Sequence, residues 1–495
     1  MRKIILLYAF MAIVVSGCMK EEGKYDNNPN TPSVVPPGLI LPKLIQDVFY
    51  QGSPNELMYP QQYMVLWLMD DNNQLYNWGR SGLGEYDIIR QTEKLITEAN
   101  RYEAKNYLAL ARFFRAYSFI TMSLKVGDIP YSEAGKASDG IFAPAYDSQE
   151  AVFAGCLQEL EEANEMLNAQ NGELTGDILY GGNILKWKKL INSYRLRVLM
   201  HLSLKTGNQR LKVIDQFRSI YTNKEKYPII ESNGEMGALA FIDRPGNRYP
   251  TYGFNYLTTE TRMCKTFTDL LKTNRDPRLF TLAEPMKDKP AGEFDSYDGI
   301  PANIAVTEMK KYEQQTSHIH KRYINNPVNE PYAMVTYADV ELVLAEAAFR
   351  GWIATDPADH YYKGIRASCA ADGVPASDVD DFVSSLPVKF DPAKALQQIN
   401  TQRYIAYFMN SKYESYYNHR RTRVTGFNPS LNDNVPLGYP AYVIGPANKN
   451  NGRIPLRWMY SQNELDNNTT HVQEAIKAQY GEDEINKSMW LLKPE

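Results

Sequence analysis

Apolar residues recur along most of this chain at the three-to-four spacing of a packed helix. The stretch 104–134 shows the pattern most strongly, because Leu110, Phe114 and Tyr117 fall on one helix face and Phe113 falls on a second. A helix that is apolar on two faces is buried between neighbouring helices. We therefore predict that this stretch is the core helix around which the chain is organised.

The same periodicity predicts further helices over 148–168, 184–205, 337–349, 356–371 and 392–417. Residues 207–331 differ, since they hold Gly, Pro, Asn and Tyr in short clusters. We expect one mostly α-helical domain over 38–495, with a helical scaffold at about 38–206 and 332–495 and a loop-rich insert with short strands at about 207–331. The helical pairs do not recur at the roughly 34-residue period of a regular solenoid.

The N-terminus carries export signals. Two basic residues precede a run of twelve apolar residues, which is too short to span a membrane and has the length of a signal-peptide core. The next residues, VSGC at 15–18, resemble a bacterial lipobox. We predict a signal peptide over 1–17, a lipid on Cys18 and a flexible, proline-containing tether over 18–37.

Composition narrows the range of functions. The net charge of -4 and the pI of about 6.0 provide no basic surface for nucleic acid. The chain has 35 tyrosines and 6 tryptophans. Their rings combine an apolar face with a polar tip, which suits sugar stacking as well as helix packing.

A polar loop at 70–80 is the main candidate for ligand binding. Tyr76 and Trp78 are two residues apart, so in an extended loop both rings would point to the same side. Amide and guanidinium groups in the loop would donate hydrogen bonds to sugar hydroxyls. The candidate residues are Asn72, Asn73, Tyr76, Trp78 and Arg80. The alternative interpretation is that Trp78 packs back on the helices.

Aromatic residues in the insert form a second candidate group, consisting of Tyr249, Tyr252 and Tyr297. Loops held on a rigid scaffold are a common place for binding residues. If the loop at 70–80 does not bind ligand, we expect the site to lie near these tyrosines.

No pattern of catalytic or metal-binding residues stands out, and we expect a binding protein that is not an enzyme and has no cofactor or metal. Adjacent carboxylates such as Asp70-Asp71 do not face one another on a helix. His318-x-His320 lacks a third ligand at a fixed spacing. The cysteines are widely spaced, and we predict that Cys156 and Cys369 are buried thiols.

A basic cluster at Arg420, Arg421 and Arg423 has two interpretations. It could bind an anion. Alternatively, these arginines could pair with the helix dipole and with acidic residues and so close the helical array, which is the interpretation we favour.

Several segments resemble one known family. Residues 111–117 (ARFFRAY), followed by 127–131 (GDIPY), look like the hallmark of the SusD/RagB family of outer-membrane lipoproteins, which capture nutrients, usually glycans. Further landmarks of the family are similar to residues 338–347, 402–406, 416–422 and 453–460. The family often has Trp where this chain has Tyr416.

The resemblance implies a fold of four tetratricopeptide-like helix pairs with ligand-binding loops on the other side. It implies a lipid-anchored protein of the outer membrane that faces the outside, binds a glycan and delivers it to a TonB-dependent transporter of the SusC type. Two alternatives stay open: capture of peptides by the same fold, and a helical scaffold that binds only protein.

Overall fold

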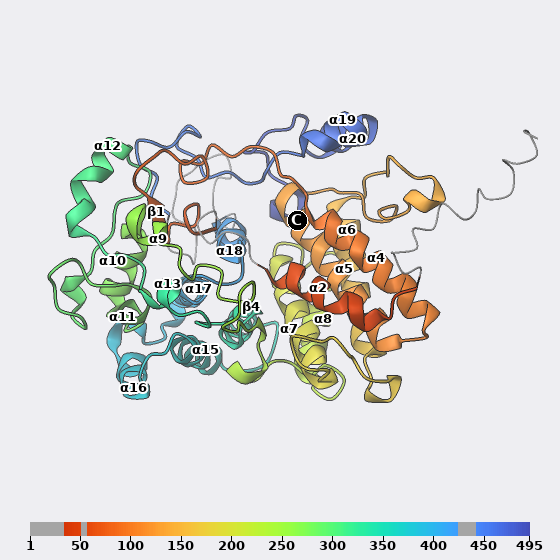
Figure 1. Ribbon diagram of the computed structural model, residues 1–495, viewed down its shortest axis with the longest axis horizontal. Coiled ribbons are helices and arrows are strands. Elements are labelled where there is room, and N and C mark those ends of the chain that lie inside the picture. Colours follow the sequence, from red (N-terminus) through yellow and green to blue (C-terminus); the bar gives the residue numbers. More distant parts are fainter. Residues whose placement is uncertain (1–33, 51–56, 424–441) are drawn as a thin grey trace, which may run out of the picture.

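The computed structural model describes residues 34–50, 57–423 and 442–495 (Figure 1). The predicted signal peptide, Cys18 and most of the predicted tether lie outside these ranges. The N-terminal part consists of long helices: α2 (Pro37–Phe49), α4 (Glu85–Arg101), α5 (Lys105–Val126), α6 (Gln149–Met166), α7 (Ile184–His201) and α8 (Val213–Thr222). Helix α5 packs against both α4 and α6.

Helix α5 is the core helix that the sequence predicts. Phe113 and Phe114 are fully buried, and their rings meet Trp187 of α7 with centroid distances of 6.1 and 5.9 Å. The helix ends at Gly127, whose φ of +97° favours glycine. A side chain there would collide with Gln479 and Tyr480. Burial on both faces of α5 confirms the prediction.

The middle of the chain forms short elements. They are β1 (Met64–Leu66), β2 (Gly237–Leu239), α9 (Tyr256–Thr259), β3 (Thr261–Met263), α10 (Lys265–Asn274), α11 (Leu279–Leu282), α12 (Val306–Met309), α13 (Arg322–Asn325) and β4 (Tyr332–Val335). Strand β1 pairs antiparallel with β3, so that Met64 lies opposite Met263. Strand β2 pairs antiparallel with β4, so that Gly237 lies opposite Val335.

The C-terminal part returns to helices: α14 (Tyr337–Phe349), α15 (Pro357–Ala371), α16 (Ala376–Ser384), α17 (Ala395–Ala406), α18 (Glu414–Arg423), α19 (Gln462–Asn467) and α20 (Thr469–Gln479). Our prediction of one helix over 392–417 is wrong. Met409, Ser411 and Lys412 have positive φ values, and a right-handed helix cannot continue through left-handed residues. The chain therefore turns between α17 and α18.

Short 3-10 turns connect the larger elements: η1 (Ala137–Asp139), η2 (Ala169–Asn171), η3 (Asn233–Glu235), η4 (Phe294–Ser296), η5 (Lys310–Gln315), η6 (Leu386–Val388), η7 (Pro392–Lys394) and η8 (Trp490–Leu492). None of the helices in the described ranges is both long and apolar enough to cross a membrane.

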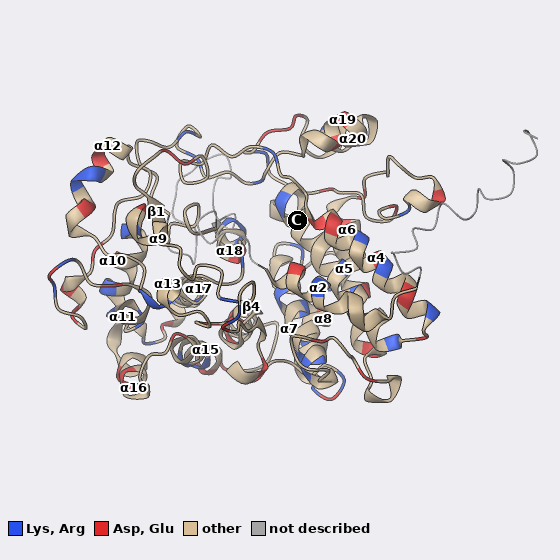
Figure 2. Ribbon diagram, viewed as in Figure 1, with Lys and Arg blue, Asp and Glu red and all other residues tan. Residues whose placement is uncertain are grey.

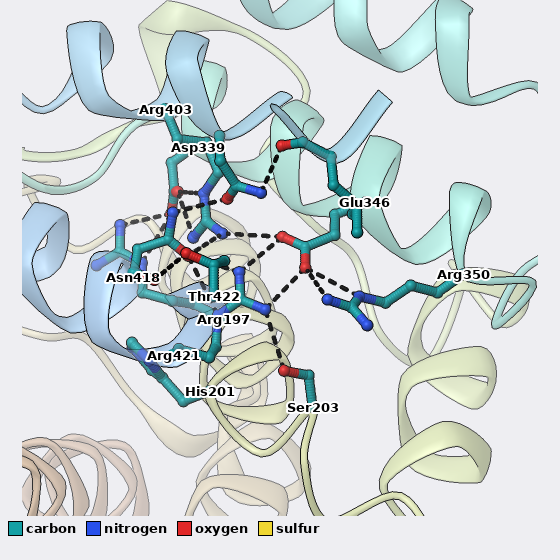
Figure 3. Close-up of polar contacts among 12 residues, drawn as sticks. Arg197, His201, Ser203, Asp339, Glu346, Arg350, Arg403, Asn418, Arg421 and Thr422 are labelled. Atoms are coloured by element: carbon teal, nitrogen blue, oxygen red, sulfur yellow. Dashed lines mark hydrogen bonds and ion pairs between the residues drawn. The ribbon is translucent and has the colours of Figure 1, made fainter. Parts of the chain in front are cut away.

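A buried ionic cluster joins the N-terminal helices to the C-terminal ones (Figure 3). Arg197 of α7 donates from Nε to Asp339 Oδ2 of α14 at 2.7 Å. Arg403 of α17 lies 3.2 Å from the other oxygen of the same carboxylate. Arg421 of α18 donates two hydrogen bonds of 2.7 Å to Glu346 of α14. Helices α7, α17 and α18 thus all bind the two buried carboxylates of α14.

The arginines of the cluster determine the charge state of those carboxylates. Burial alone would raise the pKa of Glu346, but Arg421, Arg350 and Arg403 outweigh it and hold the pKa well below its usual range. Arg197 and Arg403 do the same for the pKa of Asp339. Both groups are therefore ionised at neutral pH.

These contacts decide between the two interpretations of the basic cluster at Arg420 and Arg421. Arg421 is 3% exposed and its guanidinium is bonded to Glu346. Arg420 is 1% exposed and donates to the carbonyl oxygens of Leu124 and Leu456. The favoured interpretation, closure of the helical array, is confirmed for both, whereas the side chain of Arg423, the third member of the predicted cluster, lies outside the described residues. Elsewhere, Figure 2 shows basic and acidic residues interspersed along the helices.

Candidate functional site

The loop at 70–80 is coiled rather than extended. The backbone N–H groups of Leu75 and Asn77 donate to the carbonyl oxygens of Asp71 and Asn72, at 3.0 and 2.9 Å. Tyr76 has a φ of +58°, which reverses the direction of the chain. The expectation that the rings of Tyr76 and Trp78 lie on one exposed side therefore fails, because it requires a pleated backbone.

Both aromatic rings of this loop are buried, which corrects our expectation of exposed rings and confirms the alternative interpretation, since Trp78 packs back on Tyr416 of α18. Tyr76 is 0% exposed, and its hydroxyl accepts a hydrogen bond from Gln62 at 3.0 Å. Trp78 is 3% exposed and stacks on Trp458, with ring centroids 4.3 Å apart. The indole N–H of Trp78 donates to the carbonyl oxygen of Asn73 at 3.0 Å. In this arrangement the rings of Tyr76 and Trp78 pack into the core and anchor the loop to it.

Most polar residues of the loop lie at the surface, although Gln74 is buried. Asn72 is exposed and Asn73 is partly exposed. The side chain of Asn72 accepts a hydrogen bond from that of Asn77 at 3.2 Å. Arg80 is committed to other groups, since it donates to Asp483 at 2.6 Å. The loop therefore exposes the amide groups of Asn72 and Asn77, whereas the guanidinium of Arg80 is held in an ion pair with Asp483.

Two of the three tyrosines in the second candidate group are also buried. Tyr249 and Tyr297 are each 1% exposed. Phe241 packs on the ring of Tyr249 with the ring centroids 5.4 Å apart. Tyr252 is partly exposed, but the guanidinium of Arg248 lies over its ring at 5.1 Å. The structure therefore does not bring these three tyrosines together as an open aromatic surface.

An exposed apolar and aromatic surface does lie beside the loop at 70–80, and the sequence patterns did not lead us to predict it. Leu68 and Met69 are 41% and 55% exposed, and Phe254 is 50% exposed. The ring of Phe254 lies 5.7 Å from that of Tyr256, which begins α9. A Gly-Phe-Asn sequence at 253–255 was the available signal, because apolar rings inside a polar turn have little to bury them.

Pairing of β1 with β3 brings the segment that contains Leu68 and Met69 together with the segment that contains α9. The backbone N–H of Trp67 donates to the carbonyl oxygen of Glu260 at 3.1 Å, and its indole N–H donates to that of Thr259 at 3.0 Å. Burial raises the pKa of the Tyr59 hydroxyl, and the nearby groups of Tyr256, Asp71 and Glu260 raise it further. Asp71 belongs to the first segment and Tyr256 and Glu260 belong to the second, so both segments lie close to Tyr59. Figure 1 shows β1 and α9 next to one another.

We use the name upper loop surface for the wholly or partly exposed residues that flank the β1–β3 pair, namely Leu68, Met69, Asn72, Asn73, Asn77, Phe254 and Tyr256. The segment 442–460 supports its edge, since Lys449 donates from its backbone to Leu75 O at 2.8 Å and from its side chain to Asp70 at 3.0 Å. Exposed rings next to amide groups can stack on an apolar ligand face and hydrogen-bond to its hydroxyls.

Metal-binding geometry does not emerge at this surface or elsewhere in the described part of the chain. No group of three or more His, Cys, Asp and Glu side chains is arranged to hold a metal ion among those residues. Burial lowers the pKa of His318 to about 4, so its imidazole is neutral at pH 7. Cys156 and Cys369 are fully buried free thiols, which confirms the prediction for both.

Comparison with known proteins identifies the family. Residues 29–461 match the SusD-like family described as "Starch-binding associating with outer membrane". A SusD homologue from Bacteroides fragilis is 34% identical, with a TM-score of 0.83 over 93% of this chain and 100% of that one. A second SusD homologue from the same organism is 30% identical, with the same TM-score and coverage. No curated protein matches the chain.

More distant structures share the fold. A chitin-binding SusD homologue from Flavobacterium johnsoniae is 18% identical, with a TM-score of 0.74 over 93% of this chain and 99% of that one. At this identity the similarity shows the fold alone. The family match and the helical architecture confirm the resemblance and the mostly α-helical fold expected from the sequence. The chain belongs to the SusD-like family of starch-binding proteins that associate with the outer membrane.

Proposed function

We propose that this protein is a lipid-anchored lipoprotein on the outer face of the outer membrane. It binds a glycan on the upper loop surface and delivers it to a TonB-dependent transporter of the SusC type. Membership of a carbohydrate-binding, outer-membrane family supports this function. It acts by binding, without catalysis, nucleic acid or a cofactor.

The observation that carries the proposal is the exposure of Phe254, which precedes α9, together with that of Leu68 and Met69, which follow the strand β1 that contacts α9. Soluble proteins seldom leave neighbouring large apolar side chains exposed unless a ligand covers them. The loop that follows Met69 exposes the amides of Asn72 and Asn77 and part of Asn73, and amides suit uncharged hydroxyls. A neutral polysaccharide therefore fits better than a charged one.

Not every candidate residue from the sequence contacts ligand in this proposal. Asn72 and Asn73 hydrogen-bond to the sugar. Tyr76 and Trp78 position the loop from beneath, and Arg80 fixes its end through Asp483. Tyr252 and Tyr297 lie outside the proposed surface.

Calorimetric titration of Phe254→Ala with a panel of soluble starch, chitin oligosaccharides and xylan tests the proposal. Truncation of a central aromatic contact should weaken binding of the cognate glycan about tenfold. Phe142→Ala is the matched control, because Phe142 is 81% exposed in the segment between α5 and α6. Figure 1 places α9 far from that helix pair.

Three outcomes contradict the proposal. Equal binding by Phe254→Ala and wild type would place the glycan elsewhere. Binding of peptides in a manner that depends on their termini would favour the peptide-capturing alternative. Failure of all carbohydrates and peptides, together with capture of the transporter, would favour a protein scaffold.

Anchoring and orientation need a separate test. Cys18→Ala should release the protein from membranes and abolish labelling with palmitate, whereas Cys369→Ala should change neither, because that thiol is buried. Protease added to intact cells should digest the wild-type protein if it faces the outside. A Cys18→Ala variant that still fractionates with membranes and takes up palmitate would disprove the anchor.

A further inference from the structure

Large apolar side chains are exposed where the described chain enters the helical array. Leu39 of α2 is 73% exposed, and Leu185 of α7 is 55% exposed. Tyr102, which follows α4, and Ile178, which precedes α7, are 48% and 49% exposed. Val34, the first residue that the structure describes, is 44% exposed. We call these five residues the tether end.

Contacts among their segments place the tether end at one end of the helical array. A backbone hydrogen bond from Val35 to the Glu98 carboxylate ties the entry of the chain to the last turn of α4. Gly38 lies directly against Thr175, because a Cβ atom on Gly38 would collide with the Thr175 hydroxyl. The hydroxyl of Tyr107, near the start of α5, donates to the carbonyl oxygen of Thr175 at 3.0 Å. The entry of the chain, the start of α5 and the loop before α7 therefore meet.

The loop before α7 is organised by Asp177. Its carboxylate accepts hydrogen bonds from the backbone N–H of Gly182 and from the indole N–H of Trp187, both at 2.8 Å. Ile178 directly follows Asp177, and Leu185 lies in the first turn of α7, two residues before the buried Trp187. The exposure of Ile178 and Leu185 is therefore a fixed feature of this loop and of the helix that it leads into.

Leu39 departs from the amphipathic pattern of α2. The buried positions of this helix include Leu41, Leu44 and Val48, which share one face. Leu39 lies on the other face, where Lys43 is exposed four residues later. Large apolar side chains that gather on an exposed surface mark sites of contact with another protein or with a membrane.

The charges around the tether end are paired or mixed. Lys43 pairs with Asp47, and Arg101 lies 3.3 Å from Glu98. The turn between α4 and α5, the start of α5 and the loop before α7 expose charges of both signs: Glu103, Lys105 and Glu173. Attraction to anionic lipids requires a cluster of basic residues. Apolar contact is therefore the interaction that this end offers to a partner.

The chain connects this end directly to the predicted lipid. Val34 is sixteen residues after Cys18. Sixteen residues span at most about 55 Å, and a tether keeps the part that it joins at a high effective concentration near the anchor. A single acyl chain holds a protein only marginally on a membrane, and a second contact makes the attachment stable. Figure 1 shows α4 and α5 on one side of the molecule and α9 on the other, so this end lies away from the upper loop surface.

We propose that the tether end rests on the lipid surface of the outer membrane. Leu39, Ile178 and Leu185 enter the head-group region, and apolar contact rather than charge holds them there. This inference rests on the proposed lipid anchor at Cys18. It adds the face of the protein that touches the membrane, and it leaves the upper loop surface free for glycan.

Fluorescence quenching on vesicles tests this contact with the full lipidated protein. A label is attached through Leu185→Cys, since Cys156, Cys264 and Cys369 are buried thiols and Cys18 carries the lipid. On phosphatidylcholine vesicles that contain a quencher embedded in the bilayer, the emission of the label should fall at least about twofold. The quenching should persist in high salt, because it depends on apolar contact.

Leu386→Cys with the same label is the matched control. Leu386 is 84% exposed and lies in η6, which follows α16 on the side of the molecule away from α4 (Figure 1). Its emission should stay unchanged on the same vesicles. Adding Leu39→Ser to the Leu185→Cys protein should reduce the quenching, because this change removes an apolar contact and keeps the lipid.

The outcomes separate this inference from the proposed anchor. If the wild-type protein does not sediment with vesicles, the anchor is wrong and this inference falls with it. If the protein sediments but the label at position 185 is not quenched, only this inference is overturned. Equal quenching at position 386, or quenching that requires anionic lipid and disappears in high salt, would also overturn it. A crosslink in cells from position 185 to the transporter in place of lipid would assign the tether end to that protein instead.

Discussion

Helix α5 and the loop at 70–80 both carry aromatic side chains at regular sequence spacing, and both bury them, but for different reasons. In α5 the spacing is that of a helix, and neighbouring helices cover both faces. In the loop the spacing has no such meaning, because a left-handed Tyr76 coils the backbone. Burial of Trp78 depends on Trp458, which is distant in sequence. Periodicity therefore predicts burial only where a regular backbone makes the period meaningful.

The largest expected effect tests the contacts that hold the two helical parts together. Glu346→Gln leaves Arg421 buried without its counter-charge and removes one of the two carboxylates near Arg403, which should lower the free energy of unfolding by about 3–5 kcal/mol. Urea denaturation measures it. Glu162→Gln is the control, because the Glu162–Arg112 pair is largely exposed and should contribute less than about 1 kcal/mol. Similar losses for both variants would contradict a special role for the buried cluster.

The next effect concerns the core helix. Phe114→Ala should lower the free energy of unfolding by about 3–5 kcal/mol, since the ring is fully buried and α5 cannot collapse onto the space left behind. Scanning calorimetry of the variant, with exposed Phe142→Ala as a control, measures the change. An unchanged melting temperature for Phe114→Ala would show that α5 is not core.

Trp78→Ala tests whether the buried ring of the loop contributes to the free energy of unfolding as the buried rings of α5 do. We expect a loss of about 3 kcal/mol, at the lower end of the range for a buried aromatic residue. Denaturant unfolding measures it. A variant as stable as wild type but weak in glycan binding would instead make Trp78 a ligand contact.

The smallest effect is a pH dependence. Burial and the neighbouring carboxylate of Glu330 raise the pKa of Asp372 to about 7. A raised carboxyl pKa contributes stability below its unfolded value of about 3.9, and this contribution is lost as pH rises through 7. Asp372→Asn should therefore flatten the decline of stability between pH 4.5 and 7.5, by at most about 1.4 kcal/mol per pH unit.

Urea unfolding at pH 4.5, 6.0 and 7.5 measures that slope. Asp128, whose pKa burial raises to about 6, keeps part of the decline in the variant. The exposed Asp378→Asn should leave the slope as in wild type. The prediction fails if Asp372→Asn and Asp378→Asn have the same slope.

Much of the fold could be predicted because helix signals are local. Ser148 begins α6 by accepting a hydrogen bond from Ala151 N at 3.2 Å, as expected for a capping residue. The two apolar faces of α5 follow from residue spacing alone. The family resemblance likewise depends on contiguous segments of sequence, which is why the sequence alone was enough to recognise it.

The candidate site could not be predicted in the same way, because tertiary contacts decide which side chains are exposed. Trp78 and Phe254 both lie in polar loops beside a glycine. The ring of Trp458 covers Trp78, so that Trp78 is buried. No comparable ring stack within the described residues covers Phe254, which stays exposed. The strand pair β1–β3 then brings the segment that exposes Leu68 next to the segment that follows α9, although the two segments are distant in sequence. The sequence determined the helices and the family, whereas the tertiary structure decided the binding surface, since exposure depends on what distant segments bring to each side chain.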